Sequence, residues 1–75
     1  MSRLSTLTPR ELEILQLIIA GKSNKKIAGE IGISAKTVEF HLDNMYKKIG
    51  VRTRLMAGAW AIRQGLSIET ERISG

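Results

Sequence analysis

The most constraining feature of the chain is a pattern that repeats four times, in which Ser or Thr opens a segment and Gly closes it. The four segments cover residues 8–21, 23–32, 34–50 and 53–65. Ser and Thr are preferred at helix N-caps, and Gly is preferred just beyond a helix, where a left-handed conformation ends it. The pattern therefore predicts an all-α fold of four helices, at about 9–20, 24–31, 35–49 and 54–64.

The start of the first predicted helix carries a specific local signal. Thr8 and Glu11 have the spacing of a capping box, and Pro9 takes the first helical position. Leu7 and Leu12 have the spacing of a hydrophobic staple. Apolar residues then follow the helical period at Ile14, Leu15, Ile18 and Ile19. An amphipathic helix is expected here.

The second and third segments together predict a helix-turn-helix over about 23–49, because a short turn containing Gly32 joins two helices. At roughly 100° per residue, one face of the longer helix gathers its apolar residues, Val38, Leu42, Met45 and Ile49. Phe40 lies almost opposite that face. A large apolar side chain on a polar outer face is informative. The alternative is that Phe40 folds over onto a neighbouring helix.

Charge is concentrated in the middle of the chain. Of 12 basic and 7 acidic residues, giving a net charge of +5, eight basic and three acidic ones fall in residues 22–54. That segment therefore holds the whole net charge. A basic centre between neutral flanks indicates a surface for a polyanion such as nucleic acid. The alternative is a lysine-rich face that only adds solubility.

Several classes of protein are disfavoured by composition. There is no Cys and only one His, His41, so a metal cluster and a nucleophile paired with a base are both missing. We therefore expect no enzyme, metal or cofactor. No apolar run approaches the roughly 20 residues that span a bilayer, and the N-terminus has no signal-peptide core. One small, soluble, intracellular domain without a membrane partner is expected.

The fourth predicted helix is apolar nearly all round. Such a helix must be covered on more than one side, and a second copy of the chain is the natural candidate. We expect a dimer interface at Leu55, Met56, Ala59 and Trp60. The alternative for Trp60 is that it completes the core of the single chain.

Four stretches taken together, residues 7–11, 21–28, 33–41 and 48–51, resemble the LuxR/GerE-type helix-turn-helix family. The resemblance extends over about 7–66 and implies a bacterial DNA-binding domain. Its third helix would enter the major groove, and its fourth would dimerise on a roughly two-fold symmetric operator. Both output domains of larger regulators and small stand-alone members are known. We expect one domain over 1–75, with a core at 7–66, flexible ends at 1–6 and 67–75, and a cytoplasmic, nucleoid-associated location.

The resemblance also implies functional residues. It matches Asn24, Lys25, Ser34, Lys36, Thr37 and Lys48 to positions that contact the phosphate backbone. It matches positions 39, 40 and 43 to base-facing places, where basic residues are common. This chain departs from that pattern, because it has Glu39 and Asp43 there.

Elementary chemistry supports a similar set. Lys36 and the amides after Ser34 lie at a helix N-terminus, which favours a phosphate. Further phosphates can be neutralised by Lys25, Lys26, Lys47, Lys48, Arg52 and Arg54. The expected base-reading residues are Glu39, Phe40, Asp43 and Asn44. A carboxylate can accept a hydrogen bond from cytosine, and Asn can pair with adenine. An apolar group can contact a thymine methyl. The alternative is that the two acids are solvated or paired with Lys36, Lys47 or Arg54.

The expected partner is double-stranded DNA, bound by a homodimer that forms at least on DNA; RNA polymerase is a further candidate partner. Two alternatives remain. One is a promoter-recognition domain like that of a sigma factor, which has a similar helix-turn-helix. The other is a helical protein–protein adaptor that docks through Phe40, Met56 and Trp60. The run 37–41 and the apolar fourth helix favour the LuxR/GerE interpretation.

Overall fold

The structure is a computed structural model that describes residues 3–66. Its elements are a 3₁₀ turn, η1 (Arg3–Thr6), and four helices, α1 (Pro9–Ile19), α2 (Asn24–Ile31), α3 (Ala35–Ile49) and α4 (Arg54–Arg63). The all-α prediction is confirmed, and α1 and α4 each end one residue earlier than expected.

The structure describes part of the start that is predicted to be flexible. Residues 3–6 form η1, and the amide of Arg3 donates to Gln64 Oε1 at 2.9 Å. Leu4 also packs against the core. The general rule that chain ends fray does not predict this turn, and its contact with Gln64, just beyond the end of α4, depends on the tertiary structure. The expected flexible tail at 67–75 lies outside the described residues.

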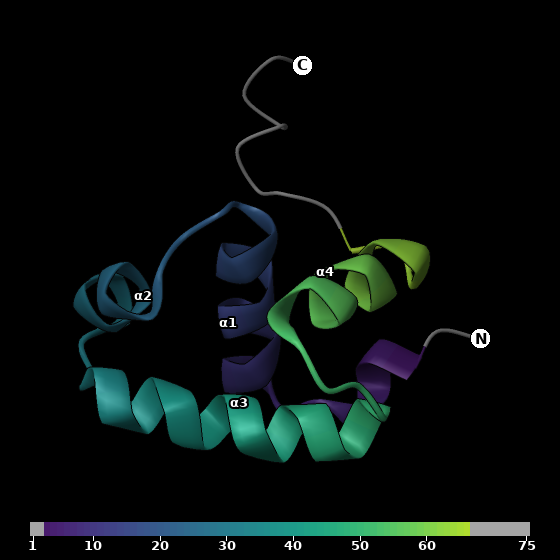
Figure 1. Cartoon of the computed structure of the whole chain (residues 1–75), viewed down its shortest axis with the longest axis horizontal. Coiled ribbons are helices and arrows are strands. Elements are labelled where there is room, and N and C mark those ends of the chain that lie inside the picture. The colour runs from purple at the N-terminus through teal and green to yellow at the C-terminus, as the bar shows by residue number, and fades with distance from the viewer. Residues whose placement is uncertain (1–2, 67–75) are drawn as a thin grey trace.

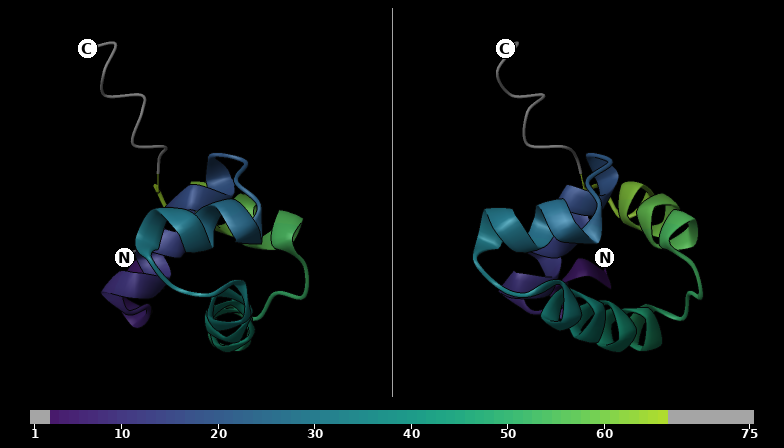
Figure 2. Two further views of the ribbon diagram at one scale, coloured as in Figure 1. Left: turned by 90° about the vertical axis from the view of Figure 1, so that its left-hand side faces the viewer. Right: turned by 60° about the vertical axis from the view of Figure 1, so that its left-hand side comes forward.

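The helices are arranged around α1, which stands between α2 and α4 (Figure 1). α3 runs along one side of the molecule, where it packs against both α2 and α1, while α4 packs against α1 (Figures 1 and 2). All four helices contribute to one apolar core. Its largest fully buried side chains are Ile14, Leu15, Ile27, Val38 and Met45.

Each helix begins with the predicted cap. A hydroxyl oxygen of Thr8, Ser23, Ser34 and Thr53 accepts a hydrogen bond from the backbone amide three residues later. Such a cap is worth about 1 kcal/mol relative to Ala. Gly32 and Gly50 cap the ends of α2 and α3 with φ of 74° at both positions. These local interactions fix where the helices begin and end.

The capping box of α1 also reaches α3. Glu11 is only 3% exposed, and its Oε1 accepts from the Thr8 amide at 2.9 Å and from the Lys48 ammonium at 2.7 Å. Burial on its own raises the pKa of the Glu11 carboxyl. The hydrogen bonds from Lys48 and Thr8, with the attraction of the Lys48 charge, outweigh burial and hold the pKa below its ordinary value of 4.5. The ionised Glu11 thus joins the start of α1 to the end of α3.

We predict that Glu11→Gln reduces the acid sensitivity of folding. A carboxyl whose pKa is lower in the folded state stabilises the fold above its unfolded pKa, near 4.5, and loses that contribution as pH falls through the folded value. The variant should therefore be less stable than wild type at neutral pH and approach it as the pH falls below 4.5. Urea unfolding from pH 7 to pH 3 measures this.

Glu13→Gln is the matched control, because Glu13 lies on the same helix but is exposed and pairs with Arg10 at the surface. Surface pairs of this kind contribute little. A constant stability difference between Glu11→Gln and wild type across the whole pH range would contradict the assignment.

Candidate nucleic-acid interface

The helix-turn-helix is built from α2, the turn at residues 32–34, and α3. Gly32 adopts the left-handed conformation, and the amides of Gly32 and Ile33 both donate to the Ala28 carbonyl, at 2.9 and 3.0 Å. These bonds close the end of α2 and redirect the chain into α3. The inward stripe of α3 is buried as predicted, at Val38, Leu42, Met45 and Ile49.

The opposite stripe of α3 faces solvent. Lys36, Glu39, Phe40, Asp43 and Lys47 are all exposed, while Thr37 and Asn44 are half-buried. Phe40 is 63% exposed. Its ring makes an edge contact with His41, with centroids 6.1 Å apart, and not with another helix. The alternative in which Phe40 folds over onto a neighbouring helix is therefore wrong.

Glu39 and Asp43 carry unpaired carboxylates on this stripe. Among residues 3–66, no ion pair or side-chain hydrogen bond involves either carboxylate. The alternative in which they pair with Lys36, Lys47 or Arg54 is not observed. Their carboxylate oxygens can accept hydrogen bonds from an incoming ligand.

The N-terminus of α3 presents two hydroxyl groups. Ser34 Oγ accepts from the Thr37 amide at 3.0 Å and lies 2.9 Å from Thr37 Oγ1, and either oxygen of this pair can be the donor. One hydroxyl hydrogen is used within the pair, so the other can be donated outward. Together with the exposed Lys36, this end of α3 combines donors, a positive helix end and a cation.

The basic middle segment divides into engaged and free cations. Lys22 pairs with Glu30 at 2.9 Å, Lys48 with Glu11 at 2.7 Å, and Arg54 donates to Asn24 and to the Lys22 carbonyl. Within the described part of the chain, the cations of this segment without an ion pair or hydrogen bond are Lys25, Lys26, Lys36, Lys47 and Arg52. The sequence does not predict the partners of Lys48 and Arg54, because these partners are distant along the chain.

Another exposed surface lies on α4. Leu55 is 83% exposed, Met56 and Ala59 are also exposed, and Ile62 is 59% exposed. Trp60 is different, at 8% exposed. Assigning Trp60 to a dimer interface was wrong: α1 packs against α4, so Trp60 joins Ala57 and Ala61 in the core. Its burial also removes Trp60 from the docking surface of the adaptor alternative.

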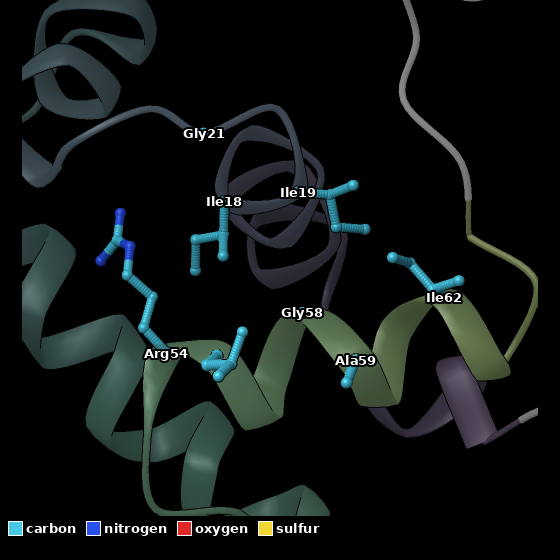
Figure 3. A pocket seen from close by; sticks show the side chains of 8 residues that line it. Ile18, Ile19, Gly21, Arg54, Gly58, Ala59 and Ile62 are labelled. Carbon is cyan, nitrogen blue, oxygen red and sulfur yellow. The ribbon is translucent and has the colours of Figure 1, made fainter.

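A groove of about 600 Å³ lies between α1 and α4 (Figure 3). Its lining is mostly apolar and consists of Ile18, Ile19, Gly21, Arg54, Leu55, Gly58, Ala59 and Ile62. Ile19 of α1 and Ile62 of α4 point toward one another across it (Figure 3). Ile62 is an exposed residue that was not predicted for this surface, although its helical spacing from Leu55 and Ala59 indicates one stripe. That α1 lines the other side of this groove follows only from the tertiary structure.

Residues 3–66 provide neither a membrane-spanning helix nor a metal-binding group. No helix there is long and apolar enough to cross a bilayer. Nor do these residues contain a group of three or more His, Asp or Glu side chains that could bind a metal ion.

Known proteins resemble the chain over most of its length. Residues 5–61 match the family described as bacterial regulatory proteins, luxR family. Over 60 residues the chain is 47% identical to the transcriptional regulatory protein MctR of Rhizobium johnstonii, a match that covers 80% of this chain and 28% of MctR. The chain therefore spans less than a third of that relative. The solved structure of the transcription factor GerE is 42% identical, with a TM-score of 0.73, and the match covers 79% of this chain and 88% of that one.

Proposed function

We propose that the chain, which belongs to the luxR family of bacterial regulatory proteins as a DNA-binding domain and not an enzyme, binds double-stranded DNA sequence-specifically. In this proposal α3 enters the major groove and α4 forms a dimer. The observation that carries this proposal is the outward stripe of α3. It is exposed from Lys36 to Lys47 and lies on a helix whose other face is buried. A helix held in this way can enter the roughly 12 Å wide major groove of B-DNA.

Phosphate contacts set the position of α3. The Ser34 and Thr37 hydroxyls, the free amides of the first turn and the Lys36 ammonium together suit one phosphate. Asn24 and Lys25 at the start of α2 supply a second group of contacts, and Lys47 a third. Such contacts fix register and orientation but carry no sequence information. Lys48 has a smaller role, since Glu11 already neutralises it.

Base recognition falls to the outward side chains of α3. The free carboxylates of Glu39 and Asp43 can accept from cytosine N4, and they repel the acceptor edge of guanine. The exposed ring of Phe40 suits a thymine methyl, and Asn44 can pair with adenine. The binding site would therefore differ from that of family members with basic residues at positions 39 and 43.

Dimerisation uses the exposed stripe of α4, with Leu55, Met56, Ala59 and Ile62 against the same residues of a second copy. A stable interface usually buries over 1,000 Å², which a single short helix does not readily provide. We expect a monomer in solution and a dimer on DNA. Two-fold symmetry places the half-sites about one helical turn, or 10 bp, apart.

In vitro selection of bound duplexes from a random pool tests the proposal as a whole, because it reports binding, base preference and half-site symmetry together. The expected product is a symmetric pair of half-sites that contain G·C pairs at fixed positions. Recovery of no enriched duplex at low salt would reject sequence-specific DNA binding.

We predict that Lys36→Ala weakens binding to all duplexes alike and lowers the magnitude of the salt slope by about one unit, since one phosphate contact is lost. Fluorescence anisotropy at several NaCl concentrations measures both quantities. Arg63→Ala is the control, because Arg63 is an exposed cation at the end of α4, outside the helix-turn-helix. An equal slope for Lys36→Ala and wild type would show that Lys36 does not bind phosphate.

We predict that Glu39→Ala or Asp43→Ala relaxes base preference at one position of each half-site, by a discrimination of about 1–3 kcal/mol. Total affinity should rise slightly, because a negative charge near the DNA is removed. Binding to a panel of single-base variants of the selected site measures this. Glu13→Ala, in an exposed acid on α1, is the control. If both α3 variants keep the wild-type preference everywhere, the carboxylates do not read bases.

We predict that Leu55→Ser combined with Ile62→Ser abolishes pairing on DNA while leaving affinity for an isolated half-site unchanged. The two substitutions remove apolar area from the exposed stripe and add no charge. Analytical ultracentrifugation with a two-half-site duplex should give a 2:1 complex for wild type and a 1:1 complex for the variant. An unchanged 2:1 complex would place the dimer interface elsewhere.

A further inference from the structure

Arg54, the first residue of α4, spans two acceptors that lie 30 and 32 positions earlier in the chain. Its Nη1 donates to Asn24 Oδ1 at 2.8 Å, and its Nη2 donates to the Lys22 carbonyl at 2.6 Å. Figure 3 shows the side chain leaving the start of α4 with its guanidinium directed toward the chain that follows Gly21. A planar guanidinium holds two acceptors in one fixed orientation, which an ammonium group cannot do.

The position of Arg54 is unfavourable for its own helix. A cation in the first turn lies near the positive end of the helix dipole. Its acceptors lie elsewhere: Lys22 follows the end of α1, and Asn24 begins α2. Arg54 therefore does not serve to stabilise α4. It ties α4 to the segment that connects α1 with α2.

This contact also fixes which way the Asn24 amide points. A guanidinium has only donors, so the oxygen of Asn24 must face Arg54, and its NH₂ group must face away. Asn24 is half-exposed, and the neighbouring Lys25 and Lys26 are exposed. The amide thus offers two N–H donors beside two free cations, at the start of a helix. A phosphate oxygen accepts hydrogen bonds from such groups.

From these contacts we propose that Arg54 is a positioning residue for DNA binding, which acts through Asn24 and the Lys22 carbonyl to set the N-terminus of α2 against a phosphate. Its role in DNA binding rests on the proposed function. The proposal assigns Arg54 no phosphate contact of its own, since two of its five N–H donors are held by protein acceptors. On this proposal the DNA does not neutralise the charge of Arg54.

Two substitutions separate positioning from direct phosphate contact. Arg54→Lys keeps the charge but cannot bridge both acceptors, so we expect about a fivefold to tenfold loss of affinity for a fluorescein-labelled duplex from the selection. Arg54→Gln should weaken binding while leaving the salt slope at its wild-type value. Near-wild-type affinity for Arg54→Lys, with a slope reduced by about one unit for Arg54→Gln, would make Arg54 a direct phosphate contact and overturn the proposal.

A double-mutant cycle tests whether Arg54 acts through Asn24. Asn24→Ala alone should weaken binding, and Arg54→Lys should add little to it in the double variant. Full additivity of the two losses would overturn the proposed link. Arg63→Lys is the matched control, since Arg63 is an exposed arginine at the opposite end of the same helix. Melting by circular dichroism confirms that each variant is folded before binding is compared.

Amide hydrogen exchange without DNA tests the positioning independently of any binding. Arg54→Lys should speed exchange at Lys26, whose amide donates to Ser23 Oγ at 3.2 Å, while exchange along α3 stays as in Arg63→Lys. Unchanged exchange at Lys26 would overturn the positioning role. Faster exchange in a protein that binds no duplex would support that role and reject the proposed function.

Discussion

Burial of the inward stripe of α3 is the constraint on which the rest of the structure depends. Val38, Leu42, Met45 and Ile49 are buried against the other helices, and each contributes about 1.5–3 kcal/mol by leaving water. Because α3 is anchored along its full length on this face, its opposite face needs no support from neighbours. The outward side chains between Lys36 and Lys47 can therefore remain in solvent on a helix of fixed orientation.

Polar contacts between the helices are added to the arrangement that the apolar core establishes. Glu11 pairs with Lys48 at the end of α3, and Arg54 joins α4 to the start of α2. Each contact uses a cation that the composition alone assigns to the surface. The basic surface is therefore smaller than the sequence suggests, but it is more localised, with free cations on α2, α3 and the segment after α3. Because Glu30 and Glu11 neutralise Lys22 and Lys48, the remaining positive field comes mainly from the unpaired cations of the helix-turn-helix and the segment after it.

Much of this fold could be predicted, because its signals are local. Caps such as Thr8 and Ser34 and the glycines at 32 and 50 act on the nearest turn of helix, so a single sequence is enough to place them. The outward position of Phe40 follows from helical geometry in the same way. The partners of Lys48 and Arg54 and the burial of Trp60 could not be predicted. Each depends on packing between helices distant in sequence, and propensity and periodicity carry no information about such packing.

The unpaired carboxylates on α3 suit sequence-specific binding of DNA better than tight binding to any DNA. Two carboxylates facing DNA weaken attraction to any phosphate backbone, whatever the sequence. On the proposed mode, the correct bases restore part of that loss through hydrogen bonds from cytosine, and incorrect bases do not. Selectivity depends on this difference and not on total affinity. On the proposed mode, a basic domain that keeps Glu39 and Asp43 unpaired at the centre of its exposed stripe thus loses general attraction to DNA and gains discrimination between sites.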